Sequence, residues 1–398
     1  MSLLKDVVVV AANYRLGVLG FLAGDELRAE SADGSVGTYG SQDQRAALEF
    51  LRDNAAAFGG DPSRVLIFGQ SAGAASVSQL LVNPRAAGLF SRAIIESGAF
   101  STWTAQPYNI SKTRLPQFAK NVGCGGASGA ALLACLRAVN ASEVLKGDKG
   151  LTSGFLEWSP AVDGVEILDD PRVLLAAGKA HDVPVMVGFN KDEGTMFAKA
   201  PKDLNESGYL AAISEFLPRN QAEIVAKEYP CSDFRADLGQ SACWWGVCEL
   251  ERDSMFACPV QKTAAALSAA ARANGGNVFA YLYTHVLFIV DIVDLFKPYR
   301  CFHGSELPLV FDLWPAMFGV GEADLATWFA TSWTTFAATG NPNYEGAPAV
   351  WPAFRAANET LMVDTGAKGV NLTAFPNLLA EKCAFWAANP VGEAVIWG

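Results

Sequence analysis

The sequence has few of the features that direct a protein to nucleic acid or into a membrane. Its 30 lysines and arginines are outnumbered by 41 aspartates and glutamates, so the formal net charge at neutral pH is -11. Such a field repels polyanions, and we expect no nucleic-acid partner. Long apolar runs are also missing, because the longest, residues 7–12, is far too short to span a bilayer and residues 286–296 are interrupted by Asp291 and Asp294. We therefore expect no transmembrane helix.

A secretory signal peptide is not recognisable at the start of the chain. Lys5 and Asp6 stand directly before four valines, whereas a signal needs a basic start, an apolar run and a small-residue cleavage site. The chain nevertheless has 8 cysteines and more Asn-x-Ser/Thr sequons than the roughly two expected by chance. These features favour a secretory-pathway history. The candidate glycosylation sites are Asn109, Asn140, Asn205, Asn358 and Asn371.

Apolar residues are abundant. They make up 51% of the 398 residues against 18% charged residues, which is typical of a folded globular protein with a large core. The length alone is compatible with two or three domains. However, no repeat, low-complexity linker or shift in composition marks a boundary between domains.

Short apolar runs alternate with segments of helical periodicity. Residues 43–58 and 72–81 have the spacing of helices, and residues 203–273 form a helical middle that we expect to be inserted in or layered on a sheet. The alternation predicts an α/β fold with a mostly parallel central sheet and helices on both faces. The predicted buried strands are residues 7–12, 65–68, 93–95, 183–188 and 278–283.

A Gly-Gln-Ser-Ala-Gly turn at residues 69–73 directly follows one predicted strand and precedes a predicted helix. In such a turn the serine is held on a sharp, strained bend, and glycines flank it because side chains there would clash. The bend exposes the hydroxyl of Ser71, and the backbone N–H of Ala72 at the start of the helix is placed to bind an oxyanion. We predict Ser71 as a nucleophile, against the alternative of a tight turn without chemistry.

A near-copy of this turn at residues 239–243 serves as an internal control. It centres on Ser241, but no apolar strand precedes it and its last position is a cysteine. We interpret this copy as a chance match.

Four segments together resemble the type-B carboxylesterase/lipase family, which includes the cholinesterases and fungal lipases. They are residues 13–21, 42–44, 58–62 and 69–73, in the family's order, and further matches reach about residue 386. The resemblance implies one α/β-hydrolase domain over residues 1–398, with no cofactor or metal. It also implies a serine, glutamate and histidine triad in that chain order.

Carried over position by position, the triad acid is Glu193, just past the predicted strand at residues 183–188. Asp192 is its rival on spacing alone, and a solvated loop carboxylate is the alternative. The base is His303. His181 precedes the acid and breaks the family's order, and His285 is followed by apolar residues, although His303 also has the alternative of an ordinary loop histidine.

The resemblance also suggests neighbours of the triad. Ser97 follows the predicted strand at residues 93–95 and matches a family serine near the acid, although a plain strand-end hydroxyl is the alternative. Gln70 stands where cholinesterases carry a glutamate. Without that negative charge, a choline ester is a poor substrate, and a carboxylesterase or lipase acting on small-molecule or lipid esters is favoured.

The cysteines match family disulfides in part. Cys124 with Cys135 matches a small closed loop, and Cys258 with Cys383 matches a long-range bridge to the C-terminal helix. The remaining four cysteines allow three pairings, and the sequence does not choose among them. These four are Cys231, Cys243, Cys248 and Cys301. Cys301, two residues before His303, could form a disulfide that holds the histidine loop or could be a free thiol.

The resemblance does not include the N-terminal segment of the family. An apolar strand and Gly-Gly turn that complete the oxyanion hole in the family have no match here, and we expect a central strand to be missing between those at residues 7–12 and 65–68. Losing one oxyanion donor costs about 10²–10³-fold in rate, so we expect a chain that folds poorly or is a weak esterase. A non-catalytic, neuroligin-like adhesion or binding protein of the same family is the second interpretation. Nothing in the sequence indicates the oligomeric state.

Overall fold

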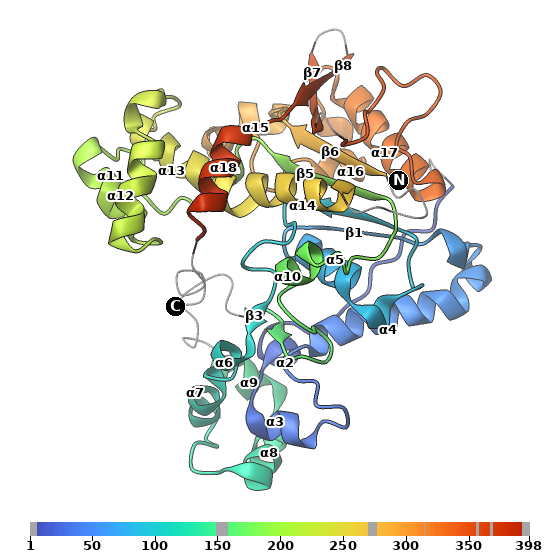
Figure 1. Ribbon diagram of the computed structural model, residues 1–398, viewed down its shortest axis with the longest axis vertical. Helices are drawn as coiled ribbons and strands as arrows, with labels where there is room; N and C mark the ends of the chain where they lie inside the picture. Colours follow the sequence, from blue (N-terminus) through green and yellow to red (C-terminus); the bar gives the residue numbers. More distant parts are fainter. Residues whose placement is uncertain are drawn as a thin grey trace.

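A six-stranded sheet runs through the middle of the computed structural model (Figure 1). The structure describes residues 6–148, 158–269, 277–313, 315–355, 358–366 and 369–391. The strand order is β1-β2-β5-β6-β7-β8, and every neighbouring pair is parallel except the last. The strands are β1 (Leu66–Gln70), β2 (Arg92–Glu96), β5 (Val185–Asn190), β6 (Val278–Tyr283), β7 (Glu359–Gly366) and β8 (Gly369–Pro376).

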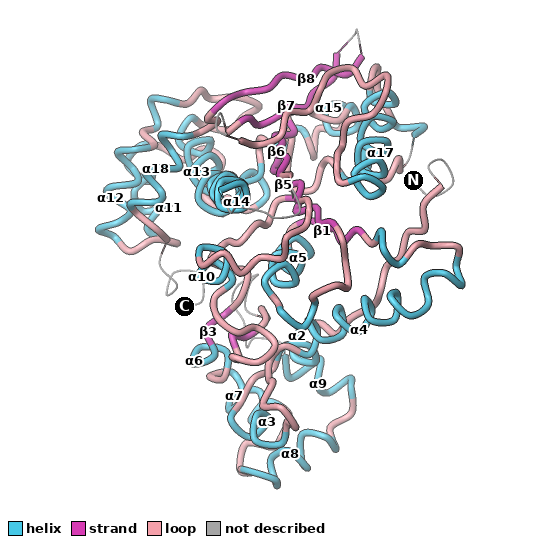
Figure 2. The backbone as a smooth tube through the Cα atoms, turned by 45° about the vertical axis from the view of Figure 1, so that its right-hand side comes forward, coloured by secondary structure: helices cyan, strands magenta, loops and turns pink. Residues whose placement is uncertain are grey.

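The central strands are buried on both faces, as continuous apolar runs require. Successive residues of one strand enter two different cores. Ile95 and Val187 pack on one face with helices α5 (Ala72–Val82) and α14 (Cys258–Ala269), whereas Ile94 and Met186 pack on the other face with α17 (Glu322–Thr339). Figure 2 shows the sheet between these two helical layers. The predicted α/β architecture is therefore confirmed, and the four predicted strands from residue 65 onward correspond to β1, β2, β5 and β6.

Two groups of helices extend beyond the sheet (Figure 1). One surrounds the disulfide between Cys124 and Cys135 and includes α2 (Gly17–Phe21), α3 (Asp25–Glu30), α6 (Tyr108–Ser111), α7 (Arg114–Asn121), α8 (Gly129–Ala138) and α9 (Ala141–Asp148). Strands β3 (Gln106–Pro107) and β4 (Ala161–Val162) form a small separate sheet beside it. The other group has its own apolar core and consists of α11 (Glu206–Ser214), α12 (Arg219–Glu228), α13 (Ala242–Arg252) and α18 (Ala380–Ala388).

The expected helical middle is layered on the sheet. Helix α13 continues through a π-helical turn, η6 (Asp253–Ala257), into α14, which packs on the sheet. The predicted helix at residues 43–58 becomes α4 (Tyr39–Asn54) and a 3₁₀ turn, η1 (Ala55–Phe58). The remaining α-helices are α10 (Pro171–Ala176), α15 (Phe288–Ile292) and α16 (Leu307–Val310). Within the described residues no helix has the length and apolar character that a membrane crossing requires.

The predicted strand at residues 7–12 is wrong. These residues form no strand, and Val8 and Val10 are each 51% exposed. A run of β-branched residues becomes a buried strand only where a neighbouring strand pairs with its backbone, and none does so here. Among the described residues β1 is consequently an edge strand, and the missing central strand stays a prediction. The first five residues, on which the expectation about a signal peptide rests, lie outside the described part.

Candidate active site

Ser71 lies on a strained bend between β1 and α5. Its backbone has φ 58° and ψ -121°, a region that non-glycine residues rarely occupy. Its N–H donates to the carbonyl of Glu96 at 2.9 Å, which continues the pairing of β1 with β2. Two glycines make room for the bend, because a Cβ at Gly69 would lie 2.5 Å from the backbone of Gly73, and a Cβ at Gly98 would lie 2.5 Å from Ser71 O. The bend predicted from the sequence is therefore present.

The second glycine of the motif behaves differently. A Cβ at Gly73 would meet no atom of the described structure within 4 Å, so the expected clash applies to Gly69 and not to Gly73. Gly73 lies in the first turn of α5, where a side chain points outward. Ala72 is the first residue of that helix, so its N–H is one of the four without a partner inside the helix. This is the position that an oxyanion donor needs.

Glu193 and His303 form a buried pair at the ends of the strands that follow. Nδ1 of His303 lies 2.6 Å from Oε2 of Glu193, whose side chain is completely buried. The other oxygen, Oε1, accepts hydrogen bonds of 2.6 Å from Ser97 Oγ and 2.6 Å from Asn190 N. The carboxylate is thus held by three donors and is aimed at the histidine. Ser97 touches the acid, as the resemblance implies.

The other nitrogen of His303, Nε2, is buried and forms no hydrogen bond in the described structure. The ring is held between Phe256, at 4.8 Å between ring centres, and Phe197, at 5.1 Å. Ser71 therefore does not bond the base in this conformation. The two segments are neighbours, however, because a Cβ added at Gly304 would lie 3.4 Å from Nε2 of Gln70. Catalytic hydrogen bonds are often long before substrate binds.

The rivals of the triad residues have other contacts. Asp192 accepts a hydrogen bond from Cys301 N at 3.1 Å, and burial raises the pKa of its carboxyl. His181 bonds the carbonyl of Asn83 at 2.8 Å. His285 lies between two carboxylates, Glu322 and Asp364. Ser241 of the near-copy caps α13, where its Oγ accepts from Trp244 N at 3.1 Å. Neither histidine touches the Ser71 bend in the contacts described.

Both disulfides implied by the resemblance are formed, Cys124 with Cys135 and Cys258 with Cys383. A third joins Cys231 to Cys243, a pairing that the sequence left open. Cys248 and Cys301 are buried free thiols. Sγ of Cys301 donates to Tyr283 O at 3.1 Å, so no bridge holds the histidine loop.

Four of the five candidate glycosylation sites are exposed, namely Asn109, Asn140, Asn205 and Asn371. Asn358 is half-buried, and its Nδ2 donates to Asn377 Oδ1 at 3.0 Å.

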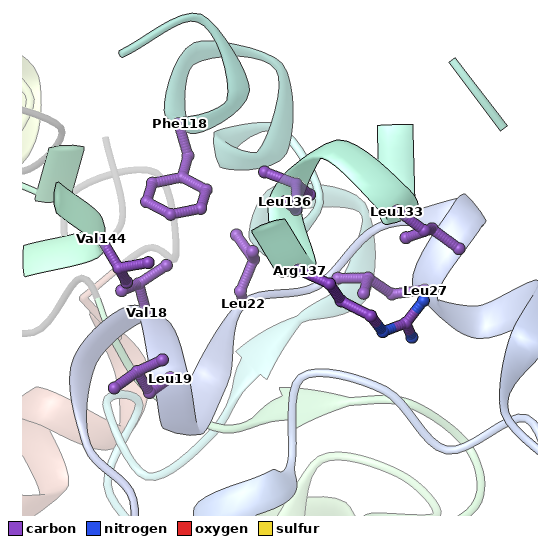
Figure 3. A pocket seen from close by; sticks show the side chains of 9 residues that line it. All are labelled: Val18, Leu19, Leu22, Leu27, Phe118, Leu133, Leu136, Arg137 and Val144. Atoms are coloured by element: carbon purple, nitrogen blue, oxygen red, sulfur yellow. The ribbon is translucent and has the colours of Figure 1, made fainter. Parts of the chain in front are cut away.

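An apolar pocket of about 160 Å³ lies among α2, α3, α7, α8 and α9 (Figure 3). It is distinct from the site around His303, because none of the elements that line it carries a residue of the predicted triad. Its lining side chains are Val18, Leu19, Leu22, Leu27, Phe118, Leu133, Leu136, Arg137 and Val144.

The sequence interpretation missed three buried polar residues beside the acid, Glu96, Asn190 and Glu306. Each ends a strand or begins a helix at the same end of the sheet as Glu193. The available signal was the position of Glu96 next to Ser97 and of Glu306 three residues after His303. No group of three or more histidine, cysteine, aspartate or glutamate side chains suited to a metal ion occurs in the described residues.

A mostly parallel sheet, a nucleophile-type bend after one strand and an acid–histidine pair after later strands define the α/β-hydrolase fold. The profile of the carboxylesterase family matches residues 1–386, and the chain belongs to that family.

One of the proteins to which the chain is similar is named as an esterase, and two others have names that state no reaction. The chain is 32% identical over 377 residues to para-nitrobenzyl esterase of Bacillus subtilis (strain 168), covering 90% of this chain and 70% of that protein. It is also 32% identical over 363 residues to neuroligin-2 of Mus musculus, covering 85% of this chain and 41% of that protein. The crystal protein of Dictyostelium discoideum is 29% identical over 381 residues, covering 91% and 65%. The chain therefore spans less than half of the neuroligin and about two thirds of the other two.

Proposed function

We propose that this chain is a serine carboxylic ester hydrolase, built as one catalytic domain, in which Ser71, His303 and Glu193 form the triad. The observation that carries the proposal is the buried 2.6 Å contact between His303 Nδ1 and Glu193 Oε2, in a chain that also holds Ser71 on a strained bend. An exposed ion pair of this kind contributes little to stability, and a buried one costs desolvation. Three donors directed at one carboxylate are more readily explained by the need to orient a base.

The proposed reaction uses an acyl-enzyme. Ser71 Oγ attacks the carbonyl carbon of the ester while its proton passes to Nε2 of His303, and the proton then goes to the leaving alcohol. Water attacks the acyl-serine, His303 takes one of its protons, and the proton returns to Ser71 as the carboxylic acid leaves. Glu193 fixes the Nδ1–H tautomer and stabilises the imidazolium. The N–H of Ala72 donates to the oxyanion.

The first step requires Nε2 and Oγ to meet. Nε2 has no hydrogen bond in the described structure and can accept a proton, and the serine and histidine loops are neighbours at Gln70 and Gly304. We propose that the displacement needed occurs when an ester occupies the site, while Phe197, edge to face at 68°, and Phe256, tilted at 45°, keep the ring among apolar groups. Apolar surroundings also strengthen the electrostatic interaction of the pair.

The proposed substrate is a small-molecule or lipid ester, in keeping with the esterase relative and with Gln70 in place of a charged residue. We also propose a secretory-pathway location. Three disulfides favour an oxidising compartment, and the exposed sequons fit that setting.

A second candidate function is protein binding without catalysis. The similarity to neuroligin-2 supports it, because the identity is the same as that to the bacterial esterase. A binding protein has no requirement for a nucleophile, so the reactivity of Ser71 separates the two candidates.

The test is covalent labelling with a fluorophosphonate probe, followed by peptide mass mapping. We expect the wild-type chain to be labelled at Ser71 and Ser71→Ala to lose both labelling and hydrolysis of a chromogenic ester. A loss of about 10⁶-fold in kcat is typical when a triad serine is removed. Ser241→Ala is the matched control, since Ser241 occupies the same sequence pattern but caps a helix.

The Ser241→Ala variant keeps its labelling if the proposal is right, although losing the cap costs about 1 kcal/mol of stability. A folded wild-type sample that takes up no probe contradicts the hydrolase proposal and favours the binding protein. Equal labelling of the wild type and Ser71→Ala also contradicts it.

A further inference from the structure

Three glutamate side chains lie completely buried at one end of the sheet, and we refer to Glu96, Glu193 and Glu306 as the acid cluster. Only Glu193 has a basic partner, His303. In the described residues no lysine or arginine forms an ion pair with Glu96 or Glu306. Trp333 Nε1 donates to Oε1 of Glu96 at 3.0 Å, and Asn190 Nδ2 donates to Oε2 of Glu306.

The second oxygen of each of these two carboxyls has no partner. Oε2 of Glu96 and Oε1 of Glu306 are both buried without a hydrogen bond in the described structure, and so is the hydroxyl of Tyr281. A buried carboxylate oxygen without a donor is costly, whereas a protonated carboxyl is itself a donor. Two buried acids that interact and lack a cation cannot both ionise at neutral pH.

The sheet brings these groups together. Glu96 of β2, Gly188 of β5 and Tyr281 of β6 occupy one row across the strands. Since Gly188 has no side chain, the ring of Tyr281 fills its place, and a Cβ there would lie 2.1 Å from the ring. Burial raises the pKa of Tyr281, and the charges of Glu96, Glu306 and Glu193 add to that effect, so all three carboxyls act on one phenol.

We propose that Glu96 and Glu306 retain at least one shared proton at neutral pH, and that Glu306 acts through Asn190 as a positioning residue for the Glu193–His303 pair. The activity part of this proposal rests on the proposed function. Glu193 is then the carboxyl of the cluster that carries the full negative charge.

The electrostatics agree with this geometry. Burial raises the pKa of Glu96 to about 8, with the charge of Glu306 adding to it and the Trp333 bond opposing it. Burial likewise raises the pKa of Glu306 to about 7, with the charge of Glu193 adding to it. The bond from Asn190, the backbone N–H of Glu306 and the charge of His303 oppose that rise. Tyr283 also lies within the field of Glu306.

Each member of the proton-holding pair is linked to a group that holds the triad acid. Asn190 donates its N–H to Glu193 at 2.6 Å and its side-chain amide to Glu306, so one residue bridges the two glutamates. Glu96 precedes Ser97 in the chain, and Ser97 Oγ donates to Glu193 at 2.6 Å. A second negative charge in the pair would therefore act on the groups that hold Glu193 against His303.

The first test needs no activity. Infrared spectra of the chain are recorded from about pH 5 to about pH 9, and the carbonyl band of protonated carboxyls is followed. We expect a band that persists at pH 6 and disappears as the pH rises through about 7 to 8. Glu96→Gln and Glu306→Gln should each remove part of it and shift the remaining transition to lower pH, because a neutral neighbour replaces a charged one.

Glu251→Gln is the matched control. Glu251 is buried on α13 with an unbonded Oε2, and burial raises its pKa to about 8, but it is not in the cluster. Glu251→Gln should remove the part of the carbonyl band that comes from Glu251 and leave the pH transition of Glu96 and Glu306 unchanged. Full ionisation of Glu96 and Glu306 by about pH 6, with no band lost in either glutamine variant, overturns the proposal.

The second test is the pH profile of kcat/KM for a chromogenic ester. Glutamine resembles the protonated acid, so Glu306→Gln should keep more activity than Glu306→Leu and should weaken the change in kcat/KM at about pH 7 to 8, where the wild-type pair loses its proton. Equal losses in both variants with that part of the profile unchanged would indicate a merely structural role and overturn the positioning assignment. A chain with the infrared transition but no reactivity at Ser71 retains the proton pair while the proposed function fails, so the two failures are distinguishable.

Discussion

The two glycines of the Ser71 bend should respond in opposite ways to the same substitution. In Gly69→Ala the new Cβ would lie 2.5, 2.6 and 2.9 Å from the C, O and Cα atoms of Gly73. All three are backbone atoms, so no side chain can rotate away and the bend itself must shift. Inserting a methyl group into such a contact typically costs 1–3 kcal/mol.

Gly73→Ala adds the same methyl group without a contact. No described atom lies within 4 Å of the new Cβ, and the position is inside α5. Alanine in a helix is favoured over glycine by up to about 1 kcal/mol. The free energies of unfolding of the two variants should therefore differ by about 1–4 kcal/mol, with Gly73→Ala equal to or above the wild type.

Urea unfolding followed by tryptophan fluorescence measures this difference, and the chain has 10 tryptophans. The shift in midpoint must occur at a constant m-value for the comparison to hold. Gly69→Ala should also lose fluorophosphonate labelling, because the same backbone atoms set the direction of the Ser71 hydroxyl. Two variants of equal stability, within about 0.5 kcal/mol, would refute the packing argument.

Two further outcomes are expected for stability. Burial lowers the pKa of His285, but its bonds to Asp364 and Glu322 outweigh this and raise the pKa to about 8. The folded state therefore holds the proton more tightly, so the contribution, at most about 2 kcal/mol, is complete below about pH 6.5 and is lost as the pH rises through about 8. His285→Asn should abolish that part of the pH dependence of the urea midpoint, and an unchanged slope would contradict it. Removing the bond between Cys258 and Cys383, which are 125 residues apart, should cost up to about 5 kcal/mol, against about 3 kcal/mol for the disulfide whose cysteines are 11 apart, as calculated from loop entropy. Urea denaturation of the variants in which the cysteines of each disulfide are replaced by serine measures the two losses of stability. A larger loss for the disulfide between Cys124 and Cys135 would contradict the entropic reasoning.

The strands that the sequence predicted correctly are those whose two faces are both covered. Residues 185–190 are all buried, so their apolar character alone marks a strand. The sequence did not predict β7 and β8, because they form an antiparallel hairpin at the sheet edge and most of β8 is exposed. The error at residues 7–12 has the same origin, since composition reports the preference for a strand and not the presence of a neighbour to pair with.

The candidate site divides in a similar way. The Ser71 bend and the acid–histidine contact follow from motifs that are local in the chain. The bridge made by Asn190 joins residues that are 3 and 116 positions away from it, and it depends on the order of the strands in the sheet. The pairing of Cys231 with Cys243 also required three-dimensional positions, because spacing allowed three combinations.

The π-helical turn η6 sets the register between two distant parts of the molecule. It places Phe256 against the ring of His303, and the next helix begins two residues later at Cys258, whose disulfide holds α18. Such a turn contains one residue more than a regular helix would. Deleting a single residue there would leave a regular α-helical turn and change the direction of Phe256, so that its contact with the ring of His303 would be lost. The length of this turn is therefore more constrained than its sequence, and natural variants should tolerate substitutions in it far better than insertions or deletions.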